Sequence, residues 1–316
     1  MPETDCQAIN ASTRYCAVYG FPIKHSASPA MQNAGIAALG LNWRYLAFEV
    51  QPEKLREAIV GAQAMRFIGL NLTVPHKLLA LEIVDVVDPA AQAWGAVNTI
   101  IFEARDADGE WKPLRCFPDR VPDELRSHGY NTDADAIVQS IREDLALEPE
   151  GARVLLLGAG GAGRTAALKL AEVGVRELFL VNRTARKAEE VAMEIRRRFP
   201  RVNATVGYPE RGQPVDLALN ATSLGLKPGD ALPIDERQFA LRDARCVYDM
   251  VYRPAETAFL KAAQAAGCRA ANGLGMLLYQ GAKALELWTG AKPPIEVMRA
   301  ALKQNVYGGV SPTGSR

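Results

Sequence analysis

The glycines Gly158, Gly160 and Gly163 form the pattern G-x-G-x-x-G, which suits the phosphates of a dinucleotide. The first glycine permits a tight turn, the second lets the backbone approach a pyrophosphate, and the third lets a helix pack closely on a strand. The N–H groups that begin the following helix add positive potential for the phosphates. The pattern alone is weak evidence, because glycine-rich turns between strand and helix also occur without a ligand.

The elements around these glycines have the order that a dinucleotide site requires. Residues 154–157 form a continuous apolar run, typical of a strand buried on both faces of a parallel sheet, and residues 165–173 have apolar side chains at helical spacing. A second strand is predicted over 177–181 and ends in Asn182-Arg183-Thr184. NAD sites commonly place an acidic residue here, whereas an arginine favours the 2′-phosphate of NADP. Arg183 therefore predicts NADP as the cofactor.

Polar side chains follow the predicted strands of the first half, where open α/β sheets bind ligands. These side chains are Ser26, Ser28, Asn71, Thr73, Lys77, Asn98, Thr99, Asn131, Thr132 and Asp133. Taken singly, Ser28, Thr73 and Asp133 could be helix caps. Lys77 could be a solvated helix residue, and Asn98 could be a turn former. Taken together, they predict one cleft for carboxylate and hydroxyl groups. For His25, in the same loop as the serines, we expect packing or hydrogen bonding rather than catalysis.

Composition excludes several classes of protein. A chain of 316 residues favours two domains, and 48% hydrophobic with 23% charged residues is ordinary for a globular protein. A net charge of +1 gives no sign of a nucleic-acid or membrane partner. Five cysteines without C-x-x-C spacing and three unpaired histidines predict neither disulfides nor a metal site, and favour the cytoplasm. We expect no signal peptide and no membrane span.

The first half alternates between strands and helices, which predicts a mainly parallel sheet. Strands are expected over 15–19, 43–50, 67–73 and 97–102, and helices over 30–39, 53–63 and 91–94. This half lacks a glycine fingerprint, so we expect it to hold the substrate. Residues 1–14 read as a frayed tail. Residues 103–130 are charged and aperiodic, which predicts a surface excursion or an ordered lid.

The second half continues the alternation. Helices are expected over 133–145, 256–266 and 272–288, and strands over 215–220 and 246–250. One more short helix is expected after Gly290, before a glycine- and serine-containing tail.

Eight segments occur in an order that resembles the shikimate dehydrogenase family of shikimate and quinate dehydrogenases. They are Ser26-Ala27-Ser28-Pro29, Asn71-Leu72-Thr73-Val74-Pro75-His76-Lys77, Gly95-Ala96-Val97-Asn98-Thr99, Asn131-Thr132-Asp133, the glycine loop 158–163, Asn182-Arg183-Thr184, Asn220-Ala221-Thr222-Ser223 and Asn272-Gly273-Leu274-Gly275-Met276. The resemblance covers about residues 15–288. It implies the reversible reduction of 3-dehydroshikimate to shikimate by NADPH, in the shikimate pathway of aromatic amino acid biosynthesis.

The resemblance also implies a fold and a division of labour. The fold is a two-domain α/β structure, with a C-terminal Rossmann NADP-binding domain and an N-terminal, mainly parallel α/β substrate domain. Residues 1–132, completed by 273–316, would bind shikimate, and residues 133–272 would bind the dinucleotide. We expect hinge closure to bring the two ligands together.

The resemblance assigns Lys77 and Asp133 as the catalytic pair. A carbonyl that accepts hydride develops negative charge on oxygen, and a nearby lysine can stabilise it and donate a proton. The implied substrate-binding residues are Ser26, Ser28, Asn71, Thr73, Asn98, Tyr252 and Gln280. The implied cofactor-binding residues are Gly158, Ala159, Gly160, Gly161, Ala162, Asn182, Arg183, Thr184, Lys187, Thr222, Met250 and Gly273. No metal is implied.

Two departures from the family pattern keep alternatives open. The family usually has a shorter hairpin where residues 103–128 stand, and usually glycine where Ala134 stands. A quinate/shikimate dehydrogenase with broader substrate or NAD use is therefore an alternative. Glutamyl-tRNA reductase is an alternative from a different reaction class. It needs a nucleophilic cysteine in its N-terminal half, and neither Cys6 nor Cys16 stands in a suitable loop, so we discount it. A non-enzymatic NADP-binding regulator would not need Lys77 with Asp133. We expect shikimate and 3-dehydroshikimate as partners, no nucleic acid or membrane, and a monomer or homodimer.

Overall fold

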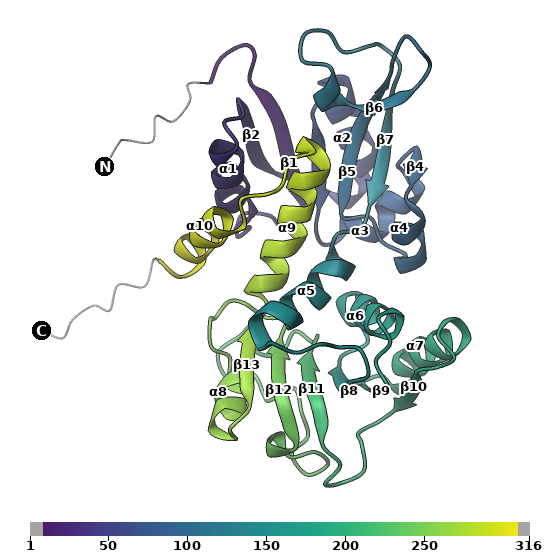
Figure 1. Ribbon diagram of the computed structural model, residues 1–316, viewed down its shortest axis with the longest axis vertical. Coiled ribbons are helices and arrows are strands. Elements are labelled where there is room, and N and C mark those ends of the chain that lie inside the picture. The colour runs from purple at the N-terminus through teal and green to yellow at the C-terminus, as the bar shows by residue number, and fades with distance from the viewer. Residues whose placement is uncertain (1–8, 309–316) are drawn as a thin grey trace, which may run out of the picture. The chain divides into compact units, whose positions relative to one another are not determined.

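The computed structural model describes residues 9–308 of the chain. The chain divides into two compact units, Met1–Thr132 with Gln280–Arg316 and Asp133–Tyr279. Each unit carries helices around a β-sheet, so the expected two-part α/β class is confirmed (Figure 1). Residues 1–8 of the predicted tail lie outside the described residues. From Asn10 the chain is held by hydrogen bonds, because Thr13 binds both Asn10 and Asn42 through its hydroxyl.

The first unit contains a seven-stranded sheet in the order β2-β1-β3-β5-β7-β4, with β6 paired to β5. Its strands are β1 (Arg14–Gly20), β2 (Trp43–Glu49), β3 (Gly69–Leu72), β4 (Val86–Val87), β5 (Thr99–Arg105), β6 (Trp111–Pro113) and β7 (Leu125–Tyr130). Strands β1, β2 and β3 run parallel, as expected. Strand β5 is antiparallel to β3, β6 and β7, so the sheet is mixed.

Helices and short 3₁₀ turns cover this sheet. They are α1 (Ser28–Ala38), η1 (Pro52–Lys54), α2 (Leu55–Ala64), α3 (His76–Leu79), η2 (Ala80–Glu82), α4 (Pro89–Trp94), η3 (Leu114–Cys116), the later part of α9 (Leu274–Thr289) and α10 (Ile295–Tyr307). Helix α9 is fixed to the sheet by the fully buried Trp288, whose indole N–H donates to the Ile100 carbonyl at 3.0 Å. Gly69 leaves room for that indole, because a Cβ there would overlap it.

The edge strand β2 is protected from pairing with another chain. The Asn33 side chain of α1 binds both backbone groups of Tyr45, accepting from its N–H at 2.9 Å and donating to its carbonyl at 2.8 Å. Arg44 covers the neighbouring carbonyl of Trp43 at 2.7 Å. Unpaired backbone N–H and C=O groups on an edge strand can pair with a strand of another molecule. By binding these groups on β2, Asn33 and Arg44 limit such pairing.

The segment 103–130 contributes the end of β5, the whole of β6 and the whole of β7 to the sheet, which corrects the expected surface excursion. Strand β5 continues to Arg105 and β7 begins at Leu125. The connection between them is anchored by the buried Leu114, whose carbonyl accepts from Arg14 at 2.9 Å. Arg115 donates to the Leu287 carbonyl of α9 at 2.8 Å. Removing the segment would therefore remove two strands of the core sheet.

A polar cluster on the end of β5 and on β7 explains why residues 103–105 and 125–130 lack a strand pattern in the sequence. Arg126 donates to Glu103 at 2.6 Å and lies 4.4 Å from the ring centre of Trp111. The Tyr130 hydroxyl lies 3.1 Å from His128 Nδ1. Burial works to raise the pKa of Glu103, but hydrogen bonds from His128 and Arg126 outweigh it, so this pKa is lowered. The charged residues that led us to predict a surface loop therefore neutralise one another on one face of the sheet.

The second unit has an all-parallel sheet in the order β10-β9-β8-β11-β12-β13 (Figure 1). Its strands are β8 (Arg153–Leu157), β9 (Glu177–Val181), β10 (Asn203–Val206), β11 (Val215–Asn220), β12 (Ala244–Asp249) and β13 (Arg269–Asn272). Its helices are α5 (Asp133–Leu145), α6 (Gly161–Glu172), α7 (Ala185–Arg198), the 3₁₀ turn η4 (Leu241–Asp243), α8 (Ala258–Ala265) and the first part of α9.

The core of this second sheet consists of the apolar runs that predicted its central strands, with Leu155, Leu157 and Val247 buried against Phe259. The edge strands β10 and β13 were not expected. Residue 272 therefore ends a strand, and the helix predicted from there begins at Leu274. Asn272 makes this boundary, because its side chain accepts from the Leu274 N–H at 3.0 Å. Among residues 9–308, no helix is long and apolar enough to cross a membrane.

Candidate active site

The two predicted serines lie near the start of α1, which follows the loop after β1. Ser26 lies in that loop, and Ser28 is the first residue of the helix. Buried Ile23 anchors that loop, and its carbonyl accepts from the Ser26 N–H at 2.9 Å. Ser28 is buried as the first helical residue, and the N-cap position belongs to Ala27, so Ser28 is not the helix cap. His25 is exposed, which disfavours packing as its role and leaves hydrogen bonding as the expectation.

Ser28 begins a chain of buried hydrogen bonds that we call the polar chain: Ser28, Tyr45, Asn71, Thr99, Asn98 and Thr132. The Tyr45 hydroxyl donates to Asn71 Oδ1 at 2.8 Å and is also bonded to the Ser28 hydroxyl. Burial raises the pKa of Tyr45 well above its ordinary value, with the Ser28 bond acting in the opposite direction. Tyr45 therefore stays a neutral hydrogen-bond donor near pH 7.

Asn98 is the junction of the polar chain and is 1% exposed. Its side-chain oxygen accepts from the Thr132 N–H at 2.8 Å, and its amide nitrogen donates to the Thr132 hydroxyl at 3.0 Å. Asn71 reaches the same junction by donating to the Thr99 hydroxyl at 3.0 Å and to the Asn98 carbonyl at 3.3 Å. The structure thus joins Ser28, Asn71 and Asn98, three of the predicted site residues.

Both predicted catalytic residues are attached to this junction through the backbone. The Lys77 carbonyl accepts from the N–H of Val97 at 2.9 Å, and Val97 directly precedes Asn98. Asp133 directly follows Thr132 and begins α5. The Lys77 side chain is half-buried in α3. The position of Asn98 therefore restricts where both residues can lie.

The remaining predicted substrate residues are less constrained by described contacts. Thr73 is half-buried just after β3, and the N-cap residue of α3 is Pro75, so the Thr73 side chain does not cap that helix. Gln280 is half-buried in α9, in the first unit. Tyr252 is half-buried after β12, in the second unit, where burial raises its pKa.

Sequence reasoning missed one member of the polar chain, Tyr45. Thr99 and Thr132 were named among the side chains of the predicted cleft, but neither was assigned an individual role. Tyr45 lies in the strand predicted over 43–50, but its hydrogen bond to Asn71 on another strand leaves no signal in the sequence.

In the second unit, the glycine loop lies where β8 ends and α6 begins. Gly158 has φ +107°, which favours glycine, and a Cβ there would lie 3.0 Å from the Ala221 carbonyl. A Cβ on Gly163 would overlap the Gly158 carbonyl oxygen. Around Gly160 and Gly161, in contrast, a Cβ would meet nothing within 4 Å. The first and third glycines are thus required for packing, and the space over the helix start stays open.

A residue at the end of β9, the strand next to β8, is hydrogen-bonded to this loop. Asn182, directly after β9, accepts from the Ala159 N–H at 2.9 Å and donates to the Thr184 carbonyl at 2.9 Å. Arg183 and Lys187 are exposed beside it. In the described part of the chain, no hydrogen bond or ion pair of the Arg183 guanidinium is found, whereas Arg186 lies 3.4 Å from Glu190. Arg183 is therefore available to an anion.

Buried hydrogen bonds centred on Asp249 organise the ends of β11 and β12. Asp249 is fully buried and accepts from Asn220 at 2.9 Å, from the Val251 N–H at 3.0 Å and from Thr257 at 2.6 Å. Asn220 in turn accepts from the Thr222 hydroxyl at 2.7 Å. This arrangement fixes Thr222 and the backbone at Met250, two predicted cofactor residues.

The second unit fits an NADP cofactor by three observations. The glycine loop leaves open space at the N-terminus of a 12-residue helix, which favours phosphate. Met250 and Gly273 touch so closely that a Cβ on Gly273 would overlap the Met250 carbonyl. Arg183 supplies an available cation. In residues 9–308, no group of three or more His, Cys, Asp and Glu side chains could hold a metal ion.

Three family models match parts of the chain. Residues 18–100 match the family model described as the shikimate dehydrogenase substrate binding domain, residues 138–223 that of shikimate / quinate 5-dehydrogenase, and residues 273–303 that of the shikimate 5′-dehydrogenase C-terminal domain. The shikimate dehydrogenase (NADP(+)) of Desulforamulus reducens is 39% identical over 309 residues, 95% of this chain and 98% of that protein.

Two solved structures have similar folds. The shikimate 5-dehydrogenase of Thermus thermophilus, in complex with NADP(H) and shikimate, is 34% identical with a TM-score of 0.76, covering 92% of this chain and 99% of the other. The quinate dehydrogenase of Corynebacterium glutamicum, in complex with NAD, is 27% identical with a TM-score of 0.74, covering 92% of this chain and 98% of the other.

The buried carboxylate gives a prediction about stability. Burial raises the pKa of Asp249 above its ordinary value, against hydrogen bonds from Thr257, Val251 and Asn220 that lower it. A carboxyl whose folded pKa is raised loses stability as the pH rises from its unfolded pKa through its folded pKa. Asp249→Asn keeps the shape without the charge, so we expect it to unfold with a larger free energy than the parent near pH 7.5. The difference should shrink toward pH 4. Urea denaturation at several pH values measures it.

Asp235→Asn is the matched control. The pKa of the exposed Asp235 is lowered by its hydrogen bond with Gln238, so this substitution should lose stability at neutral pH rather than gain it. If Asp249→Asn were also less stable than the parent at pH 7.5, the buried charge would be a net stabiliser and our account of it would be wrong.

Proposed function

The chain belongs to the shikimate dehydrogenase family, and from that premise we propose how its residues carry out the reaction. The protein is an NADP-dependent oxidoreductase that acts on a CH–OH group and interconverts 3-dehydroshikimate and shikimate, a step toward the aromatic amino acids. The observation that carries the residue assignments is the polar chain of the first unit, because it holds substrate-type groups and both catalytic candidates to one junction.

The first unit is proposed to bind the substrate. Ser26 and Ser28 supply hydroxyl donors for the carboxylate, and Asn71 and Thr73 supply groups for the ring hydroxyls. Because Asn98 is buried and its amide is bonded to Thr132, its larger contribution is to hold these groups in position. Gln280 and Tyr252 complete the proposed substrate set, from α9 and from the segment after β12.

Lys77 and Asp133 are proposed to handle the proton. The bound cofactor supplies or accepts the hydride. As the substrate carbonyl becomes a hydroxyl, its oxygen gains negative charge, and the Lys77 ammonium stabilises that charge and donates the proton. The Asp133 carboxylate orients the ammonium and the hydroxyl. In the opposite direction, Lys77 receives the proton from the hydroxyl of shikimate.

The second unit is proposed to hold NADP. Gly158 to Ala162 and the start of α6 would contact the pyrophosphate through backbone N–H groups. Asn182, Arg183, Thr184 and Lys187 would surround the 2′-phosphate end, with Arg183 as the principal cation. Thr222, Met250 and Gly273 would line the nicotinamide end. We also propose a cytoplasmic location, consistent with cysteines 16, 116, 246 and 268 being free thiols, and a monomer or homodimer, which sedimentation would distinguish.

One assay tests the function and its nearest alternative. Purified enzyme should reduce NADP⁺ with shikimate, and kcat/KM should be much lower with quinate or with NAD⁺. Comparable kcat/KM for quinate would instead support a quinate/shikimate dehydrogenase. Absence of NADP⁺ reduction with both substrates would contradict the proposal.

Arg183 should determine the choice of cofactor. A guanidinium pairs with phosphate through charge-assisted hydrogen bonds, each worth about 1.5–3 kcal/mol. We expect Arg183→Ala to weaken NADP⁺ binding by about that amount and NAD⁺ binding hardly at all, as measured by titration calorimetry. Arg186→Ala is the control, because Arg186 already has Glu190 as a partner. Equal losses for both cofactors in Arg183→Ala would remove Arg183 from the phosphate site.

Lys77 should affect turnover more than binding. The charge that it stabilises is present chiefly in the transition state, so Lys77→Ala should lower kcat by about 10²–10⁴-fold. Titration of NADP⁺ should be unchanged, because the dinucleotide is assigned to the other unit. Asp133→Asn should lower kcat as well.

Lys54→Ala is the matched control, because Lys54 is an exposed lysine of the same unit that is paired with Glu57 at 3.0 Å. Near-normal kcat in Lys77→Ala with shikimate would show that Lys77 is not catalytic.

A further inference from the structure

In the described part of the chain, some arginines of the second unit have a charged partner and others have none. Arginines such as Arg142 and Arg164 form two-pronged ion pairs with carboxylates, with Arg164 2.8 Å from both oxygens of Glu194. Within residues 9–308, no hydrogen bond or ion pair is found for the guanidinium groups of Arg211, Arg237 and Arg242. The same is true of Arg183, which we assign to a phosphate. An unpaired guanidinium keeps its donors available for an anion.

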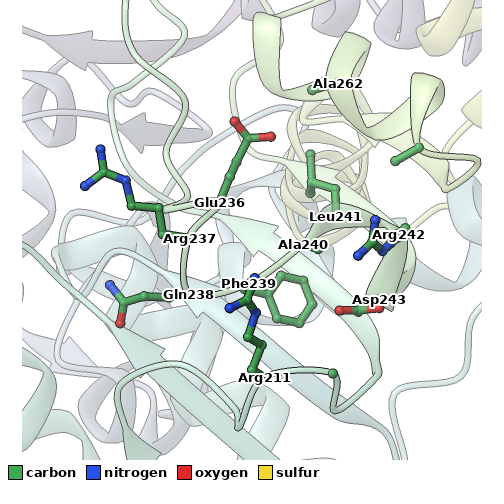
Figure 2. Close-up of a pocket in the computed structure, with 12 residues that line it drawn as sticks. Arg211, Glu236, Arg237, Gln238, Phe239, Ala240, Leu241, Arg242, Asp243 and Ala262 are labelled. Carbon is green, nitrogen blue, oxygen red and sulfur yellow. The ribbon is translucent and has the colours of Figure 1, made fainter.

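These three arginines line one cavity of about 630 Å³ (Figure 2). This volume is in the range of small-molecule sites. Arg211 enters from the loop after β10, whereas Arg237 and Arg242 flank Phe239 on the segment that leads into β12 (Figure 2). The guanidinium groups that line the cavity therefore come from two separate segments of the chain, the loop after β10 and the segment before β12.

Buried neighbours fix the backbone that carries these arginines. Phe239 is 3% exposed and Leu241 is 5% exposed, and both belong to the hydrophobic core of the unit. Arg237 precedes the first anchor and Arg242 follows the second. Arg242 also lies in the 3₁₀ turn η4, directly before β12. The positive groups thus extend from an ordered segment.

A second depression of about 470 Å³ extends the positive surface. It shares Arg242 and Asp243 with the first cavity and adds Arg176 and Arg245, for which no side-chain partner is found in the described chain. The chain as a whole has a net charge of only +1, so this concentration of arginine is local.

The site is separate from the glycine loop. Arg242 precedes the amino end of β12, whereas the proposed cofactor groups follow the carboxyl ends of β8, β9, β11 and β12. Strand β12 has six residues, which corresponds to a length of roughly 20 Å. One dinucleotide phosphate therefore cannot occupy both places.

We propose that this cavity binds a small oxyanion that carries at least two negatively charged phosphate or carboxylate groups. Guanidinium groups recognise both chemistries through paired N–H donors. Glu236 and Asp243 also line the cavity and reduce its positive charge, so a single negative charge would gain little. A ligand with several charges can pair with more than one of the arginines that line the cavity.

Titration calorimetry of the NADP⁺-saturated enzyme tests the proposal. Saturation with NADP⁺ blocks the phosphate groups of the glycine loop and Arg183, and sodium chloride keeps the ionic strength constant. Pyrophosphate and citrate are the probes, one for each chemistry. We expect saturable binding of at least one probe, at one site per chain. The probe that binds identifies the chemistry of the ligand.

Substitutions assign that binding to the cavity. Arg237→Gln/Arg242→Gln should weaken it by at least about tenfold, since two charged hydrogen-bond donors are lost. Arg211→Gln is a second variant on a different segment and should weaken it too, whereas Glu236→Gln should strengthen it. Arg201→Gln is the control, because this exposed arginine of the same unit does not line the cavity.

Three results would overturn the proposal. They are no saturable binding of either probe to the parent, unchanged binding in both arginine variants, and an equal loss in Arg201→Gln. Thermal melts without ligand confirm that each variant is folded.

Discussion

The first unit depends on the burial of one amide side chain, that of Asn98. A buried amide without partners costs about 1–3 kcal/mol, so the surrounding structure must supply them. Thr132 supplies both a donor and an acceptor, and the Asn98 backbone joins β3 and β7 through Leu72 and Tyr130. The N–H of Val97, next to Asn98, donates to the Lys77 carbonyl, and Thr132 directly precedes Asp133 in the chain. A substitution that leaves the amide unpaired would therefore disturb the sheet and the proposed chemistry together.

The second unit also uses asparagine side chains to connect neighbouring segments, here at the ends of its parallel strands. Asn182 connects the glycine loop to the turn after β9, and Asn220 connects the Thr222 loop to Asp249. An amide side chain carries a donor and an acceptor like a peptide group, so it can satisfy irregular backbone where no strand pairs with it. Asparagines at strand ends thus hold the loops that would contact both ligands, and leave hydroxyls, backbone N–H groups and Arg183 for binding.

Sequence patterns predicted the helices, strands and turns whose formation depends on residues close together in the sequence. The apolar run 154–157, the following glycines and the strand 177–181 lie where they were predicted, because burial on both faces and a tight turn each require particular residues. The end of β5 beyond residue 102 and the whole of β7 were not predicted, because Glu103 and Arg126 place charges in these strands and neutralise each other across the sheet. Tyr45 entered the polar chain through a partner 26 residues away, a contact that depends on the register of β2 and β1 against β3. Such non-local hydrogen bonds have no signature in spacing.

The central claim is that the Asn98–Thr132 contact positions the proposed catalytic residues Lys77 and Asp133, and the kcat of Thr132→Val with shikimate and NADP⁺ tests it most directly. Thr132 is 2% exposed, so its hydroxyl acts through Asn98. Valine keeps the shape but removes the hydroxyl. The account predicts a kcat lower by roughly tenfold to a hundredfold, as small misplacements of catalytic groups produce, with NADP⁺ affinity unchanged and with kcat restored in Thr132→Ser. A folded Thr132→Val enzyme with the kcat of the parent would contradict it.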